Sequence, residues 1–141
     1  MLRDDPSRSG DAVEELLRYL SISNSGVFRF PKQDLEFCGE HIPAGSTVVI
    51  SLPAVNWDEQ HRPGPGVLDL TRPRSPHLAF GHGVHQCLGR QPARMELTVG
   101  YTELLRRLPN LRLAIPTEEV PLRMDMITYG VYSLPITWDA A

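Results

Sequence analysis

The chain has 141 residues, of which 41% are apolar and 22% are charged, and its formal net charge at pH 7 is −3. These values are typical of one folded domain and exclude an extensively disordered chain. The slight acidity argues against a nucleic-acid or membrane partner, because both need a concentrated basic surface. Residues 1–10 contain no signal-like apolar run, and no stretch is long enough to cross a bilayer. We therefore expect a cytoplasmic protein with a flexible N-terminal segment at 1–10 and two free thiols, Cys38 and Cys87.

The first predicted element is a helix over residues 11–20, with Asp11 as its N-cap. One apolar face repeats along this helix, made by Val13, Leu16, Leu17 and Leu20. Small strands are predicted where short apolar segments alternate with Gly and Pro, at 27–30, 35–38 and 47–52. Prolines and glycines are dense in residues 61–76, so this stretch is expected to be irregular.

The longest predicted helix covers about residues 88–108. Its apolar residues recur at helical spacing, at Leu97, Tyr101, Leu104, Leu105 and Leu108. Pro92 removes one helical hydrogen bond, which costs up to about 3 kcal/mol unless the residue lies in the first turn. Further strands are predicted beyond Pro109, near 111–115, 121–126 and 131–138. Helices combined with small sheets indicate the α+β class.

A glycine-rich loop delivers Cys87 to the start of this long helix. Free N–H groups at a helix start and the helix dipole stabilise negative charge on a sulfur atom. We expect Gly81, Gly83 and Gly89 to adopt positive φ and to let a flat ligand approach the backbone. Phe80 is placed to shield the sulfur. These are the requirements of a cysteine that ligates haem iron.

Other interpretations of Cys87 are open on local chemistry alone. A lone cysteine is commonly a small apolar residue of the core. A zinc site could use His82, His85 and Cys87, although the sequence offers no obvious fourth ligand. A covalent c-type haem attachment is excluded because the chain has no C-x-x-C-H motif.

The run Phe-Gly-x-Gly-x-His-x-Cys-x-Gly at 80–89 resembles the cysteine-ligand signature of the cytochrome P-450 family, bacterial type. The resemblance implies a haem-thiolate monooxygenase and a C-terminal portion of the mainly helical P-450 fold. It assigns Cys87 as the axial ligand of the iron of haem b. The remaining cofactor-binding residues that it implies are His85, Arg29, Phe80, Gly81 and Gly89. Arg29 and His85 would contact the haem propionates.

A second resemblance lies upstream, where Glu15-Leu16-Leu17-Arg18 matches the family's Glu-x-x-Arg helix. It implies a structural role for Glu15 and Arg18. The family completes their network with an arginine from the irregular stretch, and the aligned position here is Val67. The sequence therefore predicts an incomplete network.

The family's reaction implies a small organic substrate and electrons that derive from NAD(P)H through a ferredoxin-like or flavin donor. Residues resembling the substrate pocket are Ser23–Phe28 and Ile127–Val131. A donor surface around the cysteine loop could be formed by Arg72, Arg74, Arg90 and Arg94.

The resemblance covers Asp11 to Trp138, about the last third of a full family member. Residues 11–141 are therefore predicted to form a partial P-450 domain, and no catalytic residue is assigned in it. The family's distal oxygen-side helix has no counterpart here, so a separate chain could supply the missing part. The alternative function is an inactive truncated remnant or a partner-dependent haem-binding module.

Overall fold

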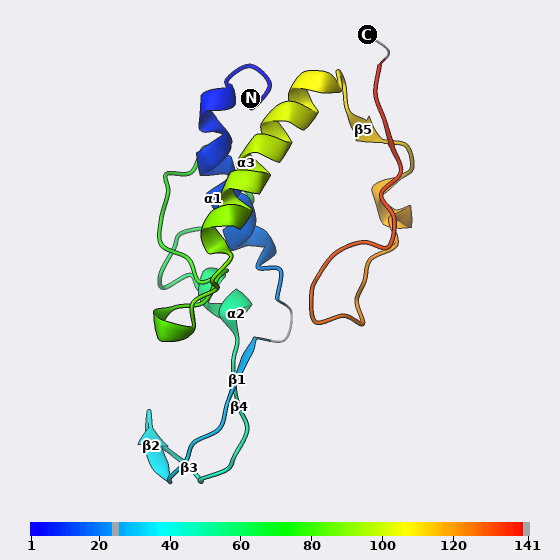
Figure 1. Ribbon diagram of the computed structural model, residues 1–141. Helices are drawn as coiled ribbons and strands as arrows, with labels where there is room; N and C mark the ends of the chain where they lie inside the picture. Colours follow the sequence, from blue (N-terminus) through cyan, green and yellow to red (C-terminus); the bar gives the residue numbers. More distant parts are fainter. Residues whose placement is uncertain (24–25, 140–141) are drawn as a thin grey trace.

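The computed structural model describes residues 1–23 and 26–139 and combines two packed helices with small antiparallel sheets (Figure 1). Helix α1 spans Ser9–Leu20 after a 3-10 turn at Pro6–Arg8, and α3 spans Arg90–Arg107. The two helices contact each other, and the Thr102 hydroxyl donates to Ser9 Oγ at 2.9 Å. A short helix, α2, covers Leu52–Asn56 and packs against α1. This arrangement confirms the predicted α+β class.

Each of the three small sheets has two antiparallel strands. Strand β1 (Val27–Arg29) pairs with β4 (Val48–Ile50), and β2 (Leu35–Phe37) pairs with β3 (Glu40–Ile42). Together these four strands extend away from the helices (Figure 1). The C-terminal pair is β5 (Arg112–Leu113) with β6 (Ile136–Thr137). A last 3-10 turn covers Thr117–Glu119.

The hydrophobic core is small and lies on one side of α1. Its buried apolar members are Ala12, Val13, Leu17 and Leu52. Among the described residues, no helix combines the length and the apolar character that a membrane crossing requires. Many large apolar side chains stay exposed, among them Met95 and Val99 on α3. This isolated chain therefore presents an unusually apolar surface.

Several element predictions need correction. Helix α1 begins at Ser9, and Asp11 is not its N-cap but accepts a hydrogen bond from Arg74. Leu20 is 42% exposed, because the helix buries the polar pair Glu15 and Arg18 in place of a fully apolar stripe. Strand β3 and helix α2 were not predicted, and the extended segment near 121–126 contributes only one isolated bridge among the described residues. The flexibility of residues 1–10 stays a prediction.

Pro92 is compatible with α3 because of where the helix begins. With Arg90 as the first helical residue, Pro92 falls in the first turn, where the backbone N–H groups have no helical partner. The next residue, Ala93, donates its N–H to the carbonyl of Gly89 at 2.9 Å. The helix therefore loses no internal hydrogen bond to this proline.

Replacing Gly26 by alanine is expected to disrupt the start of β1. Gly26 has φ +70°, and a Cβ atom there would clash with the carbonyl oxygen of Ile50 on the paired strand. Gly39 has φ +84° but open space around its Cβ position, so G39A adds only the left-handed backbone cost of about 1–2 kcal/mol. Urea unfolding should show a larger loss of stability for G26A than for G39A. Equal losses would contradict this account of Gly26.

Candidate functional site

The cysteine loop is a set of tight turns that precedes α3. The Cys87 N–H donates to the Phe80 carbonyl at 3.0 Å, and the Gly81 N–H donates to the Leu78 carbonyl at 2.8 Å. Gly81 and Gly83 have φ values of +70° and +76°, which only glycine adopts without strain. A 3-10 turn at Gly83–His85 closes the loop. The sequence therefore folds residues 80–87 into a hydrogen-bonded loop that ends on the thiol.

Gly89 differs from the expectation of a positive φ. It is the N-cap residue of α3 with φ −79°, so its backbone conformation does not require glycine. A Cβ atom at this position would lie 3.9 Å from Cys87 Sγ, which is ordinary contact distance. Cys87 itself lies just before the helix, and its carbonyl accepts the Arg90 N–H at 3.3 Å. The thiol therefore stands beside the positive end of the α3 dipole.

A cavity of about 300 Å³ opens beside the thiol. Its apolar lining residues come from β1, β4, α2 and the start of the loop, and are Val27, Ile50, Leu52, Leu78 and Phe80. Its polar lining residues are Arg29, His82, His85 and Cys87, and Gly81 contributes backbone. This donor set fits a haem. Apolar walls suit the macrocycle, cationic and imidazole donors suit its carboxylates, and a thiolate suits its iron.

The structure bears on two of the other interpretations of Cys87, the buried core residue and the zinc ligand. Both Cys87 and Cys38 are exposed free thiols, which confirms that they do not pair and contradicts a buried core role for Cys87. The Phe80 side chain lines the same cavity but leaves Cys87 exposed in this chain. Across residues 1–23 and 26–139, no three His, Cys, Asp or Glu side chains are grouped to hold a metal ion. The zinc interpretation therefore has no geometric support.

A buried ion pair on α1 connects this helix to the irregular segment. Arg18 donates twice to the Glu15 carboxylate, both at 2.7 Å, and Arg18 is 1% exposed. The remaining Arg18 donors bind backbone carbonyls of Asn56, Pro65 and Val67. Burial opposes ionisation of Glu15, but bonds from Arg18 and from the Asp69 N–H outweigh it and lower its pKa.

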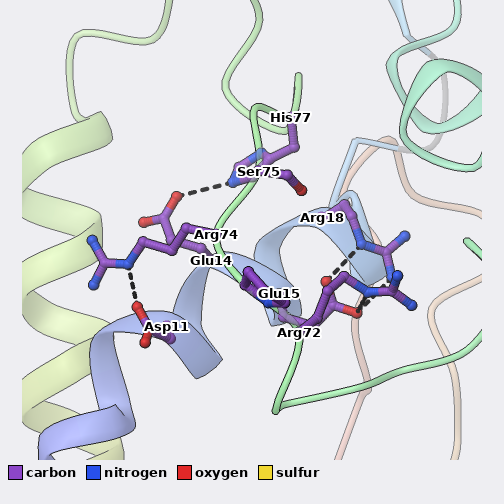
Figure 2. A pocket seen from close by; sticks show the side chains of 9 residues that line it. Asp11, Glu14, Glu15, Arg18, Arg72, Arg74, Ser75 and His77 are labelled. Carbon is purple, nitrogen blue, oxygen red and sulfur yellow. Dashed lines mark hydrogen bonds and ion pairs between the residues drawn. The ribbon is translucent and has the colours of Figure 1, made fainter. Parts of the chain in front are cut away.

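The prediction that Val67 leaves this network incomplete is wrong. Arg72 supplies the second guanidinium, with its Nε 3.3 Å from Glu15 Oε1 (Figure 2). Arg72 also donates to the carbonyls of Pro63 and Gly64, so it ties the irregular segment to α1. Val67 contributes only its carbonyl oxygen. The error arose because the irregular segment folds back on itself, which brings a later arginine to the carboxylate.

A second polar cluster, formed by Glu14, His77 and Arg94, was missed by the sequence analysis. Arg94 on α3 donates to both Glu14 oxygens, at 2.6 and 3.0 Å, and His77 Nε2 lies 3.1 Å from Glu14 Oε2. Figure 2 shows Glu14 and His77 facing each other beside the Glu15 network. Burial opposes ionisation of Glu14, but bonds from Arg94 and His77 lower its pKa overall. No local sequence pattern signals contacts between residues so far apart.

The hydrogen bonds of His77 fix its neutral form. The Ala79 N–H donates to His77 Nδ1 at 3.2 Å, so the ring proton belongs on Nε2, which then donates to Glu14. The side chain is 3% exposed. Burial lowers the pKa of His77 despite the Glu14 carboxylate, and Arg94 adds to the lowering.

Acidification from about pH 7 to about pH 5 is expected to destabilise the fold through His77, because the buried neutral ring would have to take up a charge. The folded state binds a proton less readily than the unfolded state. The stabilisation is therefore complete above the ordinary pKa of 6.5 and is lost as the pH falls below it. Urea unfolding at several pH values should show this loss in wild type and a flatter profile in H77Q. H61Q is the control, because His61 is exposed. If H77Q loses as much stability as wild type when the pH falls, the assignment to His77 is contradicted.

Comparison with known proteins decides the family. Residues 11–133 match the family model described as Cytochrome P450. The chain belongs to the cytochrome P450 family. Its fold is therefore that of a P450, as the sequence resemblance indicated.

Several P450s are similar in sequence to this chain over nearly its whole length. Cytochrome P450 105C1 of Streptomyces sp is 52% identical over 97% of the chain, and nocardicin C N-oxygenase of Nocardia uniformis is 48% identical over 98%. Among solved P450 structures, that of Rif16 is 75% identical over 98% of the chain, with a TM-score of 0.94. The chain covers 36%, 35% and 38% of these three proteins, so it spans about a third of their length.

The two segments of this P450 chain predicted to line a substrate pocket lie side by side. Ser23 forms a bridge with Thr128, and the Tyr129 N–H donates to the Ile22 carbonyl at 2.8 Å. Asn24 and Ser25, which belong to the predicted segment Ser23–Phe28, lie outside the described residues. The contact joins the chain before β1 to the C-terminal turn.

Two of the four arginines predicted to form a surface for an electron donor are occupied by contacts within the chain. Arg72 and Arg94 are committed to Glu15 and Glu14 inside the P450 fold, with side chains 18% and 28% exposed. Arg74 is 61% exposed and pairs with Asp11, while Arg90 contacts the Cys87 carbonyl. Arg74 and Arg90 therefore remain the better candidates for contact with a partner.

Proposed function

We propose that this chain binds haem b with the Cys87 thiolate as the axial iron ligand and forms the thiolate-side wall of a P450 monooxygenase. The observation that carries the proposal is the position of Cys87. The thiol ends a hydrogen-bonded loop, faces an apolar cavity and stands beside the N-terminal end of α3. These features together stabilise a thiolate and give a flat apolar group room against the backbone.

The polar lining residues are proposed to hold the haem carboxylates. Arg29 on β1 and His85 in the loop line the cavity with Cys87, at positions that converge from different elements. In this chain the Arg29 guanidinium donates to the Phe28 carbonyl at 2.8 Å and is otherwise exposed, so its remaining donors are available to an anion. Gly81 and Gly89 leave the backbone near Cys87 uncovered by side chains, and Phe80 supplies the aromatic wall.

Bound haem would supply the centre at which the family activates dioxygen and inserts one oxygen atom into a small organic substrate. The residues of this chain would bind, orient and shield that group. Electrons would come from NAD(P)H through a ferredoxin-like or flavin donor that approaches the face carrying Arg74 and Arg90. No residue of this chain is proposed to transfer protons to oxygen.

A second function is favoured by the exposed apolar surface. Cys87, Val84 and Leu88 are all exposed, the last two at 96% and 94%, and α3 exposes further apolar residues. Such a surface suits a haem-binding module that depends on a partner chain to cover it, or an inactive remnant. Turnover of an organic substrate by this chain alone would exclude both alternatives.

The test is a haem titration of the purified chain, followed by the carbon monoxide difference spectrum of the dithionite-reduced protein. A thiolate-type Soret band is expected from wild type and equally from C38S, because Cys38 lies in the distant turn between β2 and β3. Saturable haem uptake with the thiolate band supports the proposal. Uptake without that band, or no uptake, would overturn it.

A further inference from the structure

The guanidinium of Arg94 lies between two groups that belong to different parts of the fold. Two bonds fix it to the Glu14 carboxylate of α1, and its Cζ atom is 4.9 Å from the centre of the Phe80 ring. A cation over an aromatic face at this distance is attracted by the ring quadrupole. Arg94 therefore contacts an aromatic residue of the cavity lining without lining the cavity itself.

Glu14 is itself held in place, so the guanidinium has little freedom. His77 Nε2 is bonded to Glu14 Oε2, and the Ala79 N–H donates to the other nitrogen of the same ring. Ala79 directly precedes Phe80 in the chain. Glu14 is thus connected to the cysteine loop in two ways. His77 binds the backbone N–H of Ala79, and Arg94 contacts the ring of Phe80.

Phe80 connects the Glu14–Arg94 pair to Cys87 through its own contacts with that residue. Its carbonyl accepts the Cys87 N–H at 3.0 Å, and its ring and Cys87 line one cavity. We propose that Arg94 is a positioning residue that holds Phe80 against the Cys87 side of the cavity, with Glu14 as its anchor. The proposal deepens the proposed function, since it concerns the same thiolate, but its first test needs no haem.

Arg94→Lys keeps the charge and removes both the forked pairing and the planar face. In the haem-free chain, alkylation of Cys87 by iodoacetamide is expected to become about two- to fivefold faster relative to Cys38, because the released Phe80 ring no longer restricts approach to the exposed thiol from the cavity side. Cys38 serves as the internal reference, and peptide mass spectrometry gives both rates. Arg106→Lys is the matched control, because Arg106 pairs with Glu103 through two bonds on the same helix, and no contact with an aromatic ring is found for it among the described residues.

A double variant tests whether Arg94 acts on Cys87 through the Phe80 ring. If Arg94 acts through the ring, Arg94→Lys should add nothing in a Phe80→Leu background. A ratio that stays the same or falls in Arg94→Lys, or an undiminished effect in that background, would overturn the proposal. If Arg94→Lys loses its helical circular dichroism, Glu14→Gln replaces it, with a smaller increase expected because the anchor is weakened and the guanidinium kept.

The haem-loaded protein separates this proposal from the proposed function. With haem bound, Arg94→Lys should lower the fraction of carbon monoxide adduct that carries the thiolate band, while Arg106→Lys should leave it unchanged. If wild type takes up no haem, the proposed function fails, and the alkylation ratio alone still decides on Arg94.

Discussion

The C87S variant is expected to lose the thiolate-type Soret band of the reduced carbon monoxide complex completely. Serine has nearly the same shape, so the loop and its hydrogen bond from residue 87 to the Phe80 carbonyl should survive. A neutral hydroxyl cannot replace a thiolate as an electron-rich iron ligand. The carbon monoxide difference spectrum measures the effect directly, and haem affinity should fall in parallel.

The second thiol of the chain provides the control for this result. Cys38 is exposed like Cys87, but it has φ +53° in a hairpin turn away from the cavity. The C38S variant should therefore keep both the band and the haem affinity. A thiolate band that persists in C87S, or one that disappears in C38S, would show that Cys87 is not the ligand.

Local chemistry explains why the cysteine loop was predictable and its surroundings were not. The identities between Phe80 and Gly89 are contiguous, and the turns that they form depend on glycine at positions 81 and 83. The contacts of Glu14 join it to His77 and Arg94, which lie 63 and 80 residues away. Pairings at such separations follow from the packing of α1 on α3 and leave no periodic trace in the sequence.

The missed secondary structure has equally specific causes. Strand β3 contains Glu40 and His41, so it lacks the apolar alternation by which strands are recognised. The sequence predicts a strand over 47–52 and no helix after it, whereas α2 begins at Leu52. In the structure Ser51 caps α2, and Pro53 occupies its first turn, where proline is tolerated.

The apolar face of α1 shows how a buried ion pair changes a simple pattern. The expectation from spacing was a stripe containing Leu16 and Leu20. The helix instead buries Glu15 and Arg18 along with Val13 and Leu17, because the irregular segment brings carbonyl oxygens and Arg72 to that side. Sequence periodicity weighs only hydrophobicity, and therefore misplaces a face whose stability comes from satisfied charges.

The R18M variant is expected to be severely destabilised, by about 3–5 kcal/mol. It removes every bond that Arg18 makes to Glu15 and to the carbonyls of the irregular segment, and it leaves the 5% exposed Glu15 with only Arg72 and one backbone N–H. A buried carboxylate that loses its main partner retains the full cost of its desolvation. Urea unfolding followed by circular dichroism measures the change.

The chain contains an exposed ion pair with the same spacing, which serves as the control for R18M. Glu103 and Arg106 have the same i, i+3 spacing and the same two-bond contact as Glu15 and Arg18, but their side chains are 41% and 63% exposed. R106M should therefore change the unfolding midpoint very little, because water replaces the lost partner. Equal destabilisation in R18M and R106M would contradict the assignment of the large effect to the buried position of Arg18 and to its carbonyl bonds. A large difference is expected, because Arg18 is buried and also binds the backbone carbonyls of Pro65 and Val67 in the irregular segment.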